Sequence, residues 1–112
     1  MSIKGIAARL CLVALAPLAA LAAAPGAALA ADHVVTMEAF AFKPQTLQVK
    51  RGDTVEWVNK DILDHTATST QGAFDSKAIH PGGKWRWTAK QAGQYPYICS
   101  FHPNMTAVIE VQ

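Results

Sequence analysis

The chain has 112 residues, of which 51% are hydrophobic and 16% are charged, and its formal net charge is +2. The net charge changes if residues 1–30 are removed as a signal peptide, because Lys4 and Arg9 leave with them. The remaining chain, 31–112, carries 10 − 2 = 8 basic and 8 acidic residues. A chain of this size forms one small domain that buries only about 60% of its unfolded surface. Its neutrality excludes strong attraction to nucleic acid or to an acidic membrane surface.

Residues 1–30 have the pattern of a cleavable secretory signal peptide. A basic start is followed by the apolar run Leu10 to Leu21 and then by Ala28-Leu29-Ala30, a small-residue cleavage pattern. A retained membrane anchor is the alternative, but prolines and a glycine interrupt the run and leave it short of the about 20 apolar residues that a spanning helix needs. We therefore predict a periplasmic domain at residues 31–112 with no stable membrane insertion.

The predicted mature chain has the pattern of an all-β sandwich or barrel. Short apolar runs of period two alternate with Gly, Pro and Asn, and no long segment has a period of 3.6. This alternation places Trp85 and Trp87 on one face, and it places Tyr95, Tyr97 and Cys99 together on an inward face. Strands are predicted at residues 33–38, 46–50, 54–59, 66–70, 84–88, 94–100 and 106–111.

Four side chains are candidate metal ligands. The loop from Cys99 to Met105 places a thiolate, the imidazole of His102 and a thioether three residues apart from one another. His65, in a distant loop, is the natural fourth ligand because a non-local fold can bring the two loops together. Two His, one Cys and a distant Met form the ligand set of blue-copper electron-transfer centres, whereas zinc rarely takes a thioether.

Each candidate ligand also has an ordinary structural explanation. Met105 could fill a gap in the core, Cys99 could be a small buried hydrophobic residue, and either His could be a turn residue with a satisfied hydrogen bond. Once Cys11 is removed with the signal peptide, however, Cys99 has no partner for an intramolecular disulfide. The combination of donors in an exported all-β domain therefore favours the binding of one copper ion.

Several motifs spread along the mature chain belong together. They are Phe42-x-Pro44, Val49-Lys50-Arg51-Gly52-Asp53-Thr54-Val55-x-Trp57-x-Asn59, Asp64-His65-Thr66, Gly72-Ala73-Phe74-Asp75-Ser76, Pro81-Gly82-Gly83, Gly93-Gln94-Tyr95-x-Tyr97-x-Cys99 and Cys99-x-x-His102-x-x-Met105. With them, about the whole mature chain resembles the cupredoxin family, and within it the plastocyanin and amicyanin branch. The two-residue gap between His102 and Met105 is similar to the short amicyanin-type loop.

The resemblance implies a Greek-key β-sandwich of about eight strands with one type 1 copper near one end. His65, Cys99 and His102 would form the trigonal plane, and Met105 would be the weak axial ligand. Many relatives carry Asn directly after the first His ligand, where it ties the two ligand loops together and hydrogen-bonds near the thiolate sulfur. This chain has Thr66 there. Because such hydrogen bonds tune ligand orientation and redox potential, the potential of the family does not transfer to this chain.

The expected function is electron transfer by Cu(II)/Cu(I) cycling in an exported monomer that is not an enzyme. In the resembling proteins the His of the C-terminal loop shows its ring edge to solvent within an apolar patch. We therefore expect redox protein partners to dock around His102, which would be ringed by Phe101, Pro103 and Phe74. A periplasmic copper carrier or buffer with the same ligands is the alternative. A multicopper oxidase would need further His-rich motifs and domains, and the predicted mature chain is too short to hold them.

Two other histidines are weaker candidates. His80, before Pro81-Gly82-Gly83, is expected to be a solvated turn residue. After cleavage at Ala30, the terminus Ala31-Asp32-His33 could wrap Cu(II) or Ni(II) in a square-planar set of nitrogen atoms. Coincidence is the simpler explanation, because any His near a frayed terminus produces the same pattern.

Overall fold

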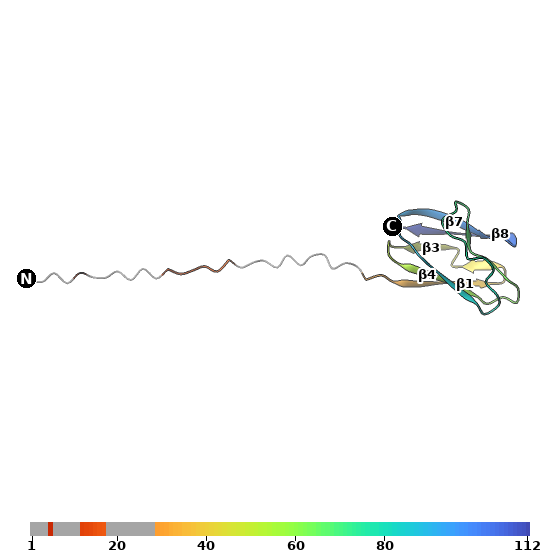
Figure 1. Ribbon diagram of the computed structural model, residues 1–112, viewed down its shortest axis with the longest axis horizontal. Coiled ribbons are helices and arrows are strands. Elements are labelled where there is room, and N and C mark those ends of the chain that lie inside the picture. The colour runs from red at the N-terminus through yellow and green to blue at the C-terminus, as the bar shows by residue number, and fades with distance from the viewer. Residues whose placement is uncertain (1–4, 6–11, 18–28) are drawn as a thin grey trace, which may run out of the picture.

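The computed structural model describes residue 5, residues 12–17 and residues 29–112, and the last of these ranges contains a β-sandwich (Figure 1). Most of the predicted signal peptide, residues 1–30, lies outside the described residues. Within the described ranges, no helix combines the length and the hydropathy that crossing a bilayer requires.

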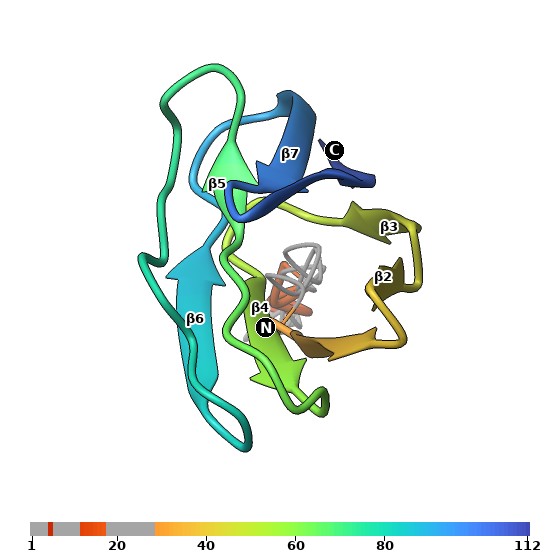
Figure 2. The same cartoon turned by 90° about the vertical axis from the view of Figure 1, so that its right-hand side faces the viewer.

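Eight strands form two four-stranded sheets that face each other (Figure 2). They are β1 (Asp32–Glu38), β2 (Ala41–Lys43), β3 (Thr46–Val49), β4 (Thr54–Asn59), β5 (Thr68–Ser69), β6 (Lys84–Thr88), β7 (Gly93–Cys99) and β8 (His102–Val111). One sheet has the order β2-β1-β4-β6 and the other the order β3-β8-β7-β5, with β1–β4 and β3–β8 as parallel pairs. Several neighbouring strands, such as those of the two parallel pairs, thus come from distant parts of the chain, and the predicted Greek-key β-sandwich is confirmed.

All seven predicted strands are present, and β2 is the strand that the sequence pattern missed. β2 pairs with β1 through the two-residue turn Ala39-Phe40, whose φ angles are 52° and 56°. Turns of this kind favour Gly or Asn, because a left-handed conformation costs other residues about 1–2 kcal/mol each. The sequence around Ala39 therefore gives no hairpin signal, and the stabilisation has to come from elsewhere in the fold.

The core between the two sheets fixes the position of the predicted thiol ligand. On β7, Tyr97 is 1% exposed and Cys99 is fully buried, so the thiol points inward as the alternation predicts. The ring of Tyr97 packs edge-on against Phe42 and Trp57, with ring centroids 4.6 and 5.6 Å away. Because Cys99 follows two residues after this locked ring on the same strand face, its side chain has little freedom to move.

A buried carboxylate organises the start of β4. Asp53 accepts hydrogen bonds from the backbone N–H groups of Ala31 and Lys50, and its Oδ2 also lies 2.9 Å from Nε2 of His33. These donors, led by the Ala31 amide, lower the pKa of Asp53 from 3.8 to about 2. His33 is part of β1 and pairs with Val55 of β4, so the backbone here is extended. The square-planar site considered for Ala31-Asp32-His33 would require this strand end to open, and the structure disfavours it.

We predict that Asp53→Asn lowers the thermal stability of the metal-free protein at neutral pH. Because the pKa of the folded state lies below the unfolded value, the carboxylate contributes stability that is fully present above about pH 4 and is lost as the pH falls towards about 2. Thermal unfolding followed by circular dichroism should show a gap between the wild type and the variant that closes over this range. Asp32→Asn is the control, because Asp32 is exposed and pairs with Arg86 at the surface. Equal effects of the two substitutions would contradict the prediction.

Candidate metal centre

Three of the four predicted ligands lie together at one end of the sandwich. Nδ1 of His65 and Nδ1 of His102 each lie 3.6 Å from Sγ of Cys99, and the donor atoms of all three residues are within 4.8 Å of one another. Metal–nitrogen and metal–sulfur bonds of about 2.0 and 2.3 Å, about 120° apart, would place such donors about 3.7 Å from each other. The arrangement therefore fits a single ion in the plane of three donors.

Each of these donors is positioned by backbone pairing. His65 lies in the loop after β4, where its N–H and C=O pair with the C=O and N–H of Ile79 at 3.2 and 2.7 Å. Cys99 ends β7 and His102 begins β8, and the register shift between Ile98 and Cys99 turns both side chains to the same point. His65 and Cys99 are fully buried, whereas His102 is half-buried. One ligand therefore faces solvent and two do not.

Met105, the fourth predicted ligand, is 3% exposed on the inward face of β8. With Phe40 and Phe42 it lines a small cavity of about 150 Å³. Phe40 in turn packs edge-on against both ligand rings, with centroids 5.6 Å from His65 and 5.0 Å from His102. This placement is compatible with Met105 as an axial ligand, a role that stays a proposal.

Thr66 occupies the bridging position where the family pattern has Asn. Its N–H donates to Sγ of Cys99 at 3.3 Å, and its Oγ1 accepts a hydrogen bond from the Ser100 N–H at 2.8 Å. The same hydroxyl lies 2.7 Å from Oγ of Ser100 and 2.8 Å from Oγ1 of Thr68. Thr66 thus contacts the sulfur through its backbone and ties the two ligand loops together through one buried oxygen.

An apolar face surrounds the exposed edge of His102. We define the apolar face as Phe40, Ile62, Leu63 and Phe101, which are 51, 91, 47 and 53% exposed. A groove of about 540 Å³ is lined by three of these residues, by His102 and by two others: Ile62, Leu63, Asp64, Pro81, Phe101 and His102. Phe101 was expected here, but Phe40, Ile62 and Leu63 were not. The pair Ile62-Leu63, apolar within a loop that precedes a predicted ligand, is the signal that could have identified this side of the face.

The expectation that Phe74 lies beside His102 is wrong. Phe74 is 7% exposed and packs among the aromatic rings of the core, with centroids 5.4 Å from Trp57 and 4.6 Å from Trp87. The Ser69 N–H donates to the Phe74 C=O at 2.9 Å, and Thr68 pairs with Asp75 in an isolated bridge. This tight reversal after β5 turns the Phe74 ring inward, away from the apolar face.

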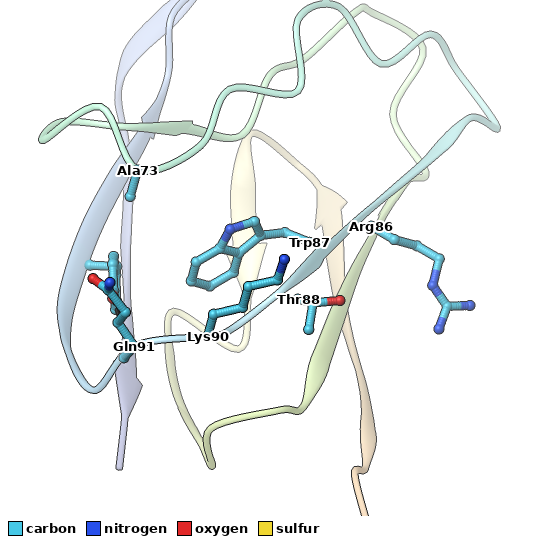
Figure 3. Close-up of a pocket in the computed structure, with 7 residues that line it drawn as sticks. Ala73, Arg86, Trp87, Thr88, Lys90 and Gln91 are labelled. Atoms are coloured by element: carbon cyan, nitrogen blue, oxygen red, sulfur yellow. Dashed lines mark hydrogen bonds between the residues drawn. The ribbon is translucent and has the colours of Figure 1, made fainter.

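Two other features lie outside the cluster of donors. His80 is exposed in the turn before β6, and its Nδ1 lies 2.9 Å from Oδ1 of Asp64. A cavity of about 520 Å³ near the turn between β6 and β7 is shown in Figure 3, where the side chain of Arg86 points away from those of Trp87 and Lys90. None of the described residues that line this cavity is a His, Cys, Met or carboxylate. It therefore lacks donors for a soft metal ion.

Comparison with known sequences agrees with the geometry. A family model described as a cupredoxin-like domain matches residues 10–111. Amicyanin from Paracoccus denitrificans is 32% identical over 93 residues, which cover 77% of this chain and 71% of the relative. Amicyanin from Paracoccus versutus is 29% identical over 84 residues, which cover 70% of this chain and 64% of the relative.

Solved structures give the same result. A Cu(I) form of an amicyanin mutant has a TM-score of 0.69 and 27% identity, and the match covers 72% of this chain and 82% of that one. A copper-containing nitrite reductase from Thermus scotoductus SA-01 also has a TM-score of 0.69, with 31% identity, but the match covers only 22% of the reductase. This structural similarity is therefore no basis for assigning the activity of that larger protein to this chain. The chain belongs to the cupredoxin-like family, whose cofactor is type 1 copper, and its character within that family is amicyanin-like or plastocyanin-like.

Proposed function

We propose that this protein is a blue-copper electron carrier in which His65, Cys99 and His102 bind copper in a plane and Met105 binds it axially. The observation that carries the proposal is the 3.6 Å separation of each Nδ1 from Sγ of Cys99. Copper held there would supply a one-electron couple, since thiolate and thioether suit Cu(I) and imidazole suits both oxidation states.

The contribution of the polypeptide is to keep the donor atoms in one arrangement. Burial excludes water from Cys99 and His65, and the Thr66 N–H on the sulfur restricts the thiolate further. A donor set that cannot rearrange suits rapid electron transfer, because little reorganisation accompanies the change of oxidation state. It also disfavours an enzymatic role, because the four proposed ligands would leave no open position for a substrate.

The half-buried His102 is the proposed electron port. It lies at the groove bounded by Phe101 and the loop of Ile62 and Leu63, so a partner seated on the apolar face would contact its ring. An apolar surface on a domain of neutral formal charge suits small, brief contacts with redox proteins. We propose that the carrier itself is a monomer and that these partners are proteins.

We also propose that the protein is periplasmic and that cleavage after Ala30 releases residues 31–112. The backbone nitrogen of Ala31 lies 2.9 Å from Oδ1 of Asp53. Cleavage there would replace this amide by an α-ammonium group, and a charged donor forms a stronger hydrogen bond with a carboxylate. The processed terminus would thus be held against β4 by an ion pair.

Copper reconstitution tests the proposed ligands. Cu(II) added to residues 31–112 is expected to give an intense visible band from thiolate-to-copper charge transfer, and Cys99→Ser should abolish it because a hydroxyl is a poor substitute for the thiolate. His80→Gln is the control and should keep the band, since His80 is exposed and paired with Asp64. A colourless copper complex of the wild-type domain would contradict the proposal.

Thr66→Val tests the bridge between the ligand loops. Valine keeps the shape and the N–H on the sulfur but leaves the Ser100 N–H without its acceptor in a partly buried hydrogen bond. We expect a loss of about 1–3 kcal/mol in the free energy of unfolding, measured with urea, with the visible band retained. Thr70→Val, which removes an exposed hydroxyl that donates to the Pro96 C=O, should cost much less. Indistinguishable stabilities of the two variants would refute the bridging role.

Electron self-exchange distinguishes a carrier of electrons from a carrier of copper. The wild type should exchange electrons rapidly and release copper slowly, as measured by NMR line broadening in mixed oxidation states and by transfer of copper to a chelator. Leu63→Lys should slow self-exchange by about tenfold or more at low salt, because two copies would then meet with like charges at the apolar face. Val34→Lys, at a similarly exposed position on β1, should have a smaller effect. Slow self-exchange with fast copper release in the wild type would favour the copper carrier instead.

A further inference from the structure

The carboxylate of Asp61 connects a predicted copper ligand to the turn that covers it. Its Oδ2 lies 2.6 Å from Nε2 of His65. Its Oδ1 accepts a hydrogen bond from the Ala39 N–H at 2.7 Å, and Oδ2 accepts another from the Phe40 N–H at 3.1 Å. The side chain is only 13% exposed. One carboxylate therefore joins the loop of His65 to a turn that lies far from it in the sequence.

We propose that Asp61 is a positioning residue of the copper centre, which sets the ring of His65 and the placement of Phe40 together. This inference rests on the proposed function. A carboxylate at Nε2 keeps the imidazole proton on that atom, so Nδ1 retains its lone pair toward Sγ of Cys99. The other tautomer would place the proton on the nitrogen that has to bind the metal.

The same carboxylate stabilises an unfavourable turn. Ala39 and Phe40 have φ angles of 52° and 56°, a region that residues with a side chain rarely adopt. Both N–H groups of the turn donate to Asp61, which compensates for this conformation. The turn holds the Phe40 ring edge-on to His65 and His102 and beside the cavity lined by Met105. Loss of the Asp61 carboxylate should therefore loosen both the His65 ring and the Phe40 ring that covers it.

The position of Asp61 is itself determined by a buried side chain. Asn59 is fully buried at the end of β4, and its Oδ1 accepts a hydrogen bond from the Asp61 N–H at 2.9 Å. Its Nδ2 donates to the C=O groups of Leu63 and Ile79 at 2.8 Å each. The carboxylate is thus built into the loop that leads to His65. From there its negative charge favours Cu(II) over Cu(I), so it should lower the redox potential of the centre.

The first test compares Asp61→Asn with Asp64→Asn in the copper-loaded protein. Both changes remove one negative charge from the same loop, but Asp64 pairs with His80 rather than with a ligand. We expect Asp61→Asn to weaken Cu(II) binding about 10–100-fold. If Cu(I) binding is unaffected, each tenfold loss raises the potential by about 59 mV. Asp64→Asn should change affinity and potential much less.

The second test uses NMR of the metal-free protein, where copper plays no part. ¹⁵N shifts should show the Nε2–H tautomer of His65, with a slowly exchanging imidazole proton, in the wild type and in Asp64→Asn. This proton should exchange rapidly in Asp61→Asn. Phe40→Leu should keep the protected proton while altering the electron paramagnetic resonance spectrum of the copper form. This variant therefore distinguishes the effect of the Phe40 ring from that of the hydrogen bond between Asp61 and His65.

Two results would overturn the inference. One is an Nδ1–H tautomer of His65 in the metal-free wild type, which can be measured even if Asp61→Asn does not fold. The other is an equal shift of potential in the two Asp variants together with a protected His65 proton in Asp61→Asn. Either result would leave the blue colour of the wild type, and with it the proposed function, intact. A colourless wild type would instead refute the proposed function.

Discussion

The proposed copper centre depends on the joining of two loops that lie far apart in the sequence. Sγ of Cys99 lies between the Nδ1 atoms of two imidazoles and accepts the N–H of Thr66, while the Thr66 hydroxyl holds Ser100 in the other loop. Thr66 and Cys99 are buried, so a polar atom of either residue that loses its partner cannot readily bind water instead. The geometry of the donors is therefore a property of the whole sandwich, since either loop alone would present its donors to solvent.

β4 links this junction to the opposite end of the domain. At its start Asp53 gathers the donors of Ala31, His33 and Lys50, and at its end Asn59 positions the loop of Asp61 and His65. Asp53 and Asp61 each accept hydrogen bonds from several N–H groups that lie outside β4. In a small domain with little hydrophobic surface to bury, such polar anchors at strand ends restrict loops that the core does not reach.

The sequence allowed prediction of the features that depend on local pattern or on residue type. Alternation located seven strands and the inward direction of Cys99, and donor chemistry identified the cluster of His65, Cys99 and His102. Features that depend on distant contacts were not predictable in this way. β2 was missed because its turn is stabilised by Asp61, and Phe74 was misplaced because a reversal after β5 turns its ring into the core. The sequence did not reveal the bridging role of Thr66, because its hydrogen bond to the sulfur comes from a backbone N–H, which every residue type except proline provides.

The asymmetry between the two histidines explains how one site can be both closed and accessible. His65 is fully buried, with Nε2 held by a carboxylate and Nδ1 directed at the sulfur, so both of its nitrogen atoms are committed to the interior. His102 commits only Nδ1 and leaves part of its ring at the groove beside Phe101. Electrons would then leave through the more exposed ring of His102, while the His65 ring and the Asp61 carboxylate hold the donor set rigid. A symmetric pair of buried histidines would protect the metal equally well but would isolate it from any partner.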